Sequence, residues 1–263
     1  MVLNILGKGN NEKSVVGGGH CSNINSYFKR WCKAFTHVAH WKDSRKVAFT
    51  LAEVLITLGI IGVVAALTLP NLIENHNRKV VETRLEKVYS TMNQAIRMAE
   101  LDYGERETWF VDYSDKNAQK VWIEKYLLPY LNYTKFEEVQ VNSGNYRNAI
   151  YFSDGSVLTK NSNNGSDWWF FPGNIEKCIK LSANNFRNNI GKCTFAFYYN
   201  PTNNTTYHTF NPLGVGASKT EEIFKYDTNY GCYQGNSWKA YCTALIQYNG
   251  WKIPKDYPYR VYY

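Results

Sequence analysis

The chain has 263 residues, enough to bury a sizeable core in one large domain or two small ones. It contains 21 Tyr, 13 Phe and 8 Trp, a composition that favours a folded core of aromatic rings and β-structure over disorder. The net charge is +8, but the residues before Phe49 hold eight Lys and Arg against two acids, which leaves only +2 for the rest. This distribution argues against a nucleic-acid-binding domain, and we expect no nucleic-acid partner.

Residues 49–69 form an apolar run of 21 residues whose one charged residue is Glu53. A helix of that length spans about 31 Å, enough to cross the hydrocarbon core of a bilayer. Lys42, Arg45 and Lys46 lie just before the run, and this basic flank predicts a cytoplasmic N-terminus and an exported remainder. We therefore expect a single-pass membrane protein.

The stretch AFTLAEVLITLGIIGVVAALTLP, residues 48–70, resembles the class III signal sequence of type IV pilins and of the pseudopilins of type II secretion. The resemblance implies that a prepilin peptidase cuts between Ala48 and Phe49 and that the new amine of Phe49 is methylated. Residues 1–48 would then be a leader that is removed. Two features depart from the family pattern: Ala48 replaces the usual Gly, and the leader is long, unless its start is assigned too far upstream.

The same resemblance gives roles to Glu53 and Pro70 as assembly residues of the helix. In a bundle of parallel apolar helices, the carboxylate of Glu53 can pair with the amine of Phe49 on a neighbouring subunit, since either charge buried alone is costly. Pro70 matches the family's helix-loosening proline. Two alternatives stay open: an incidental acid near the headgroups of a plain anchor, and ordinary signal peptidase cleavage after Ala66 that releases a soluble protein beginning at Leu67.

After Pro70 the apolar residues keep a helical period. Val81, Leu85, Val88 and Met92 recur at spacings of three and four, which predicts an amphipathic continuation over residues 71–103 with one face against a later β-sheet. The whole helix is expected from Phe49 to about Leu101, with its membrane half at residues 49–70.

Residues 104–263 are expected to form a globular α+β domain with a small antiparallel sheet. A short helix is predicted within residues 115–131, a β-hairpin over 148–160 with its turn at Asp154-Gly155, and strands in DWWFFPG and KCTFAFYYNP. Residues 200–237 are predicted to form long loops between short strands, and residues 239–248 a last helix. The fold class is therefore α+β, with a long N-terminal helix packed on the sheet.

Four cysteines follow the apolar run: Cys178, Cys193, Cys232 and Cys242. They allow three pairings, of which the nearest-neighbour pairing closes the shortest loops; free buried thiols are the alternative. A bond between Cys232 and Cys242 would resemble the disulfide-bounded C-terminal region of type IV pilins.

These features predict a structural subunit, a minor pilin or pseudopilin, that assembles into a cell-surface filament and performs no reaction. The expected partners are prepilin peptidase, other pilin or pseudopilin subunits and inner-membrane lipid, with no cofactor and no metal. Residues 161–167, NSNNGSD, contain one acid, Asp167, and do not match the spacing of a calcium loop, and His208 alone does not make a hydrolase. The alternative is an anchored or secreted extracytoplasmic module that binds carbohydrate or protein through Trp168 or Trp169, one of which is expected in the core.

Overall fold

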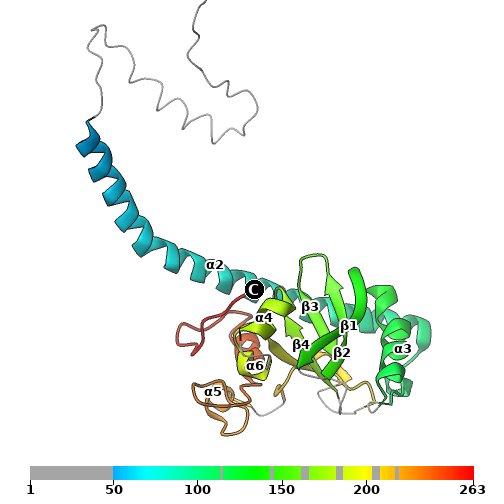
Figure 1. Ribbon diagram of the computed structural model, residues 1–263. Helices are drawn as coiled ribbons and strands as arrows, with labels where there is room; N and C mark the ends of the chain where they lie inside the picture. The colour runs from blue at the N-terminus through cyan, green and yellow to red at the C-terminus, as the bar shows by residue number, and fades with distance from the viewer. Residues whose placement is uncertain are drawn as a thin grey trace, which may run out of the picture. The chain divides into compact units, whose positions relative to one another are not determined.

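The computed structural model describes residues 50–112, 115–142, 145–160, 166–181, 186–202, 208–216 and 219–263. The chain divides into two units, Met1–Leu58 and Gly59–Tyr263. The described part of the first unit is the beginning of helix α2, which runs from Leu51 to Tyr103 (Figure 1). The helix ends at Gly104, whose positive φ of 78° is unfavourable for any residue with a side chain. The predicted long helix is thus confirmed from Leu51 onward.

The second unit continues with short helices and six strands. Their bounds, in chain order, are η1 Arg106–Thr108, α3 Lys116–Tyr126, η2 Leu128–Tyr130, β1 Tyr133–Asn142, β2 Asn145–Phe152, β3 Val157–Lys160, β4 Asp167–Phe171, α4 Ile175–Lys180, η3 Phe186–Asn189, β5 Phe195–Tyr198, β6 Asn211–Pro212, α5 Glu221–Tyr226 and α6 Cys242–Tyr248. The strands form one antiparallel sheet in the order β1-β2-β3-β4-β5-β6. The α+β class with an antiparallel sheet is therefore confirmed.

The sheet is covered on both faces. Since successive side chains of a strand point to opposite faces, each of the strands β2 to β5 contributes residues to both core clusters. On β4, Trp168 and Phe170 lie in the core cluster that contains the buried residues of α2. Trp169 and Phe171 lie in the second cluster, which Ile175 of α4 and the Cys178–Cys193 disulfide complete. Figure 1 shows the second half of α2 lying along the sheet, with α4 close to β3 and β4.

The amphipathic half of α2 forms the centre of the first cluster. Its buried residues follow the predicted spacing: Val81, Leu85, Val88, Met92, Ala95, Ile96 and Ala99. The side-chain amide of Asn93, on the same helix, adds two hydrogen bonds to these apolar contacts. It donates to the carbonyl of Phe210 at 2.8 Å and accepts from its N–H at 3.1 Å, so the helix supplies hydrogen bonds beside β6, at the edge of the sheet.

Several elements differ from the sequence-based predictions. β1, α4 and α5 were not predicted, and α5 lies inside residues 200–237, where long loops between short strands were predicted; the short strand β6 agrees with that prediction. The last helix begins at Cys242 rather than Lys239, because Lys239 has a φ of 42°, outside the right-handed helical region. The hairpin prediction is confirmed: β2 pairs with β3, and Gly155 has a φ of 80° in the turn.

We predict that Asn93→Leu destabilises the domain by about 2–3 kcal/mol, because the buried N–H and carbonyl of Phe210 both lose their side-chain partner. Urea unfolding of the detergent-solubilised chain, followed by near-ultraviolet circular dichroism, measures the difference. Gln94→Leu is the matched control on the exposed side of the same helix turn and should change the free energy of unfolding little. Equal effects of the two substitutions would contradict the assigned role of Asn93.

Candidate functional site

The first half of α2 presents a long uncovered apolar surface. One 18-residue window of this helix has a mean hydropathy of 2.3, and none of it is buried within the protein, so the helix is long and apolar enough to span a membrane. Large apolar side chains that are 43–80% exposed are Leu51, Val54, Leu55, Ile56, Leu58, Ile60, Ile61, Val63, Val64, Leu67, Leu69, Leu72 and Ile73. Such a surface needs a covering of lipid or of other apolar helices.

Glu53, the single charge of this segment, is held by its own helix terminus. Its Oε2 accepts hydrogen bonds from the backbone N–H and the hydroxyl of Thr50, both at 2.9 Å, while the Thr50 hydroxyl accepts from the N–H of Glu53 at 3.3 Å. This reciprocal pair is a capping box, which satisfies N–H groups that have no partner inside the helix. Glu53 therefore has a local structural role in the single chain, besides any role between chains.

The other predicted residues of this segment have different outcomes. Ala48 and Phe49, the predicted cleavage and methylation site, lie outside the described residues. Pro70 lies inside α2, and the helix continues through it although proline cannot donate the backbone hydrogen bond of its turn. The span Leu51–Ile73 is followed at once by the polar residues Glu74 to Lys79.

The chain's last residues, 251–263, bind the part of α2 that follows this apolar segment. The guanidinium of Arg78 donates to the carbonyls of Ile253 at 3.0 Å and Pro254 at 2.7 Å, and the carboxylate of Glu82 accepts from the N–H of Ile253 at 2.8 Å. Nearer the apolar segment, His76 Nε2 lies 2.9 Å from the hydroxyl of Tyr263. We call residues 251–263 the C-terminal tail. It attaches the domain to α2 within one to three helical turns of Ile73.

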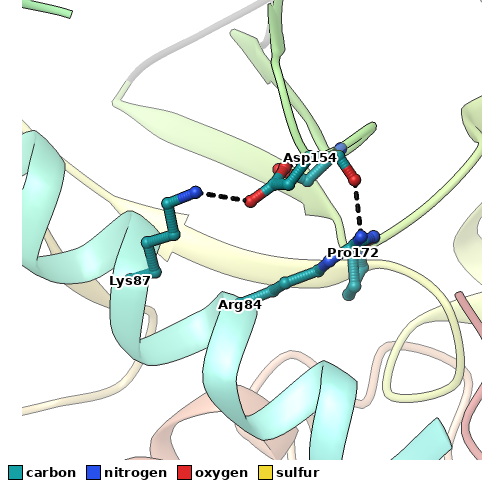
Figure 2. A network of polar contacts seen from close by, with 5 residues as sticks. Arg84, Lys87, Asp154 and Pro172 are labelled. Atoms are coloured by element: carbon teal, nitrogen blue, oxygen red, sulfur yellow. Dashed lines mark hydrogen bonds and ion pairs between the residues drawn. The ribbon is translucent and has the colours of Figure 1, made fainter. Parts of the chain in front are cut away.

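A second polar contact joins α2 to the β2–β3 turn (Figure 2). Lys87 Nζ lies 2.8 Å from Asp154 Oδ2, and Arg84 donates to the backbone carbonyls of Asp154 and Pro172. Asp154 Oδ1 also accepts from the N–H of Ser156 at 3.0 Å and from its hydroxyl at 2.6 Å. Partial burial of Asp154 favours its neutral form, but the hydrogen bonds from Lys87 and Ser156 outweigh it and lower the pKa of Asp154 to about 2. Turn chemistry and helix attachment thus account for Asp154 and Ser156.

The four cysteines form two disulfides, Cys178–Cys193 and Cys232–Cys242, which is the nearest-neighbour pairing. The first joins α4 to the loop before β5, and the second joins the loop after α5 to the start of α6. Disulfides persist in oxidising compartments, so both bonds favour an extracytoplasmic location for the domain.

The candidate binding residues Trp168 and Trp169 are both buried, with 1% of each side chain exposed. One of the two was expected in the core, whereas the structure buries both. The sheet is covered on both faces, so each ring lies in a core cluster of its own. Neither ring is available to stack on a ligand.

The backbone carbonyl of His208 accepts a hydrogen bond from Arg106 at 2.9 Å. Because Arg106 also donates to the Glu100 carboxylate, this contact ties His208 to the end of α2. Across the described ranges, no three His, Cys, Asp or Glu residues are grouped so that they could hold a metal ion.

A family of unknown function, DUF6613, matches residues 71–261. The chain belongs to this family. The match begins directly after Pro70, so it covers the amphipathic half of α2 and the α+β domain, while the apolar segment with Glu53 precedes it. Neither the curated proteins nor the solved structures contain a significant match.

Sequence reasoning missed the polar residues that attach α2. Thr50 could have been found, because T-L-A-E over residues 50–53 has the Thr-x-x-Glu spacing of a capping box. Arg78, Glu82 and Asn93 had no such signal, since each binds backbone groups more than 100 residues away. A charged residue on an amphipathic helix ordinarily indicates a solvated face.

We predict an acid-sensitive contribution from Asp154. Its pKa is about 2 in the folded chain and about 4 when unfolded, so its stabilisation is present above pH 4 and is lost as the pH falls through 2. Allowing for the exposure of Lys87, the contribution is about 1–2 kcal/mol. Between pH 4 and 2 the free energy of unfolding should fall by about 1–2 kcal/mol more for the wild-type chain than for Asp154→Asn. Urea unfolding at each pH measures both free energies. Parallel curves for the two chains would contradict the assigned contact.

Proposed function

We propose that this chain is a pilin-like structural subunit, a minor pilin or pseudopilin, that is processed by prepilin peptidase and assembled into a type IV pilus or a type II secretion pseudopilus. The observation that carries the proposal is the two-part character of α2. One half is apolar on all sides, uncovered, and carries a single acid near its start, while the other half is buried against an α+β domain. A subunit built in this way can wait in the inner membrane and later exchange lipid for neighbouring helices.

The position of Glu53 supports this proposal on physical grounds. Removal of residues 1–48 would place a new amine at Phe49, one residue before Thr50, whose N–H and hydroxyl contact the Glu53 carboxylate. Within an apolar bundle, both charges lose their hydration, and pairing between neighbouring subunits compensates for that loss. The capping box fixes the carboxylate on the helix terminus, so every subunit presents it at the same axial height.

The capping role and the pairing role of Glu53 can be separated by substitution. Glu53→Gln keeps an oxygen that can accept from Thr50 and removes only the charge, whereas Glu53→Val removes both. If pairing drives assembly, each variant should remain membrane-inserted and fall by about tenfold or more in sheared filaments, since an unpaired buried charge costs several kcal/mol. Quantitative immunoblots of filament and membrane fractions measure the ratio. Wild-type incorporation of Glu53→Gln would show that only the cap is needed and would contradict charge pairing.

Processing gives a separate test. Mass spectrometry of the mature chain should find an N-methylated Phe49 as the first residue. A mature chain beginning at Leu67 would contradict the proposed membrane subunit, because the apolar segment would be absent from the product.

A further inference from the structure

The C-terminal tail and α4 enclose an apolar cavity close to the end of the apolar segment of α2. Its volume is about 430 Å³, within the range of small-molecule sites. Its walls include Gly173, Leu181, Tyr262, Tyr263 and both sulfur-bearing residues of the Cys178–Cys193 disulfide. The position is built into the fold, because a Cβ on Gly173 would lie 2.1 Å from the carbonyl carbon of Tyr263. The tail can close over the cavity only because residue 173 has no side chain.

The charge at this cavity is positive. Lys177 and Lys180, one helical turn apart on α4, both line it and are exposed, and among the described lining residues the one acidic group is the α-carboxylate of Tyr263, which leaves a net charge of +1. A neighbouring cavity of about 510 Å³ shares Gly173, Lys177 and Tyr263, but Asp154 and Glu176 also line it, beside Arg84 and Lys135. The smaller cavity therefore combines an apolar interior with two ammonium groups, which fits an amphiphile with a negative head.

The height of the cavity relative to a membrane follows from α2. The uncovered apolar surface ends at Ile73, and His76, three residues later, lies about 4.5 Å further along the helix axis. His76 contacts Tyr263, which is part of the cavity wall. The polar layer of a bilayer is about 5–8 Å thick on each side, so Tyr263 lies at the level of the lipid headgroups when the apolar segment spans the hydrocarbon core. Tyrosine favours this level in membrane proteins.

The adjoining surface is also basic. Residues 74–84 of α2 and the C-terminal tail together hold six Lys and Arg against three acids. Two of those acids, Glu82 and Glu74, lie near basic residues of the tail, Lys252 at 3.3 Å and Arg260 at 3.9 Å. The net positive charge that remains favours anionic lipid over zwitterionic lipid.

We propose that this cavity binds an anionic phospholipid of the surrounding membrane. The phosphate lies between Lys177 and Lys180, and the glycerol esters with the first methylene groups occupy the apolar interior. The lipid would hold the base of the domain against the membrane before assembly. This inference rests on the membrane-anchored state in the proposed function, and it is independent of the filament itself.

The test uses the full chain in nanodiscs of equal phosphatidylglycerol and phosphatidylcholine, from which native mass spectrometry counts the lipids that remain bound after extraction. The wild-type chain should retain phosphatidylglycerol in preference, and Lys177→Glu/Lys180→Glu should reduce that retention about thirtyfold, as expected when two ammonium groups of about 1 kcal/mol each are lost. Arg97→Glu/Lys120→Glu makes the same change in net charge at exposed positions of α2 and α3 and should retain the lipid as the wild type does.

A third variant tests the apolar wall. Leu181→Gln leaves the charge unchanged and should also reduce retention, because ester and methylene groups lose an apolar contact. Retention that is unchanged in either cavity variant, or that falls equally in the control, would overturn the proposal. Displacement of the lipid by millimolar glycerol phosphate would show that the lysines bind a free phosphate ester and would overturn it too. Failure of filament assembly in Glu53→Val leaves these results unaffected, so the two proposals fail separately.

Discussion

An apolar surface in a folded chain must be covered, and α2 meets this requirement differently in its two halves. From Val81 to Ala99 the protein's own sheet covers the apolar face, and the helix is the centre of the larger core cluster. From Leu51 to Ile73 no other part of the described ranges covers it. The uncovered half must therefore meet lipid or other helices, and the rest of the structure serves to fix one domain to one end of that half.

The attachment of the domain to α2 is polar as well as apolar. Arg78, Arg84 and Asn93 each use side-chain groups to bind backbone carbonyls of the tail, the β2–β3 turn and the sheet edge. These hydrogen bonds have two consequences. They satisfy carbonyls at places where the chain is irregular, and they fix the rotation of the helix about its axis, which apolar contacts alone specify less strictly.

The parts of the fold that could be predicted from the sequence are those set by local patterns. The period of Val81, Leu85, Val88 and Met92 predicted the buried face of α2, and Asp154-Gly155 predicted the hairpin turn. β1 was missed because Lys135, Glu137 and Glu138 interrupt the alternation of apolar and polar residues in this strand, which lies at an edge of the sheet.

The remaining differences have non-local causes. α4 has six residues, too few for a periodic signal, and its place depends on the disulfide from Cys178 to Cys193. The burial of both Trp168 and Trp169 depends on α2 covering one face of the sheet and α4 with Trp238 covering the other, which no pattern within β4 can indicate. Residues of the candidate site divide in the same way: Glu53 and Pro70 stand out in the apolar run, whereas the tail contacts of His76 and Arg78 join positions about 180 residues apart.

The tail determines how firmly the anchor and the domain are coupled. Without residues 251–263, residues 74–80 of α2 would have few described partners, because the contacts of His76 and Arg78 are made with the tail. A helix segment that lacks tertiary contacts is held by its backbone hydrogen bonds alone, and short polar segments of this kind are marginal in water. With the tail in place, helix and domain share contacts up to the last turn before the apolar segment.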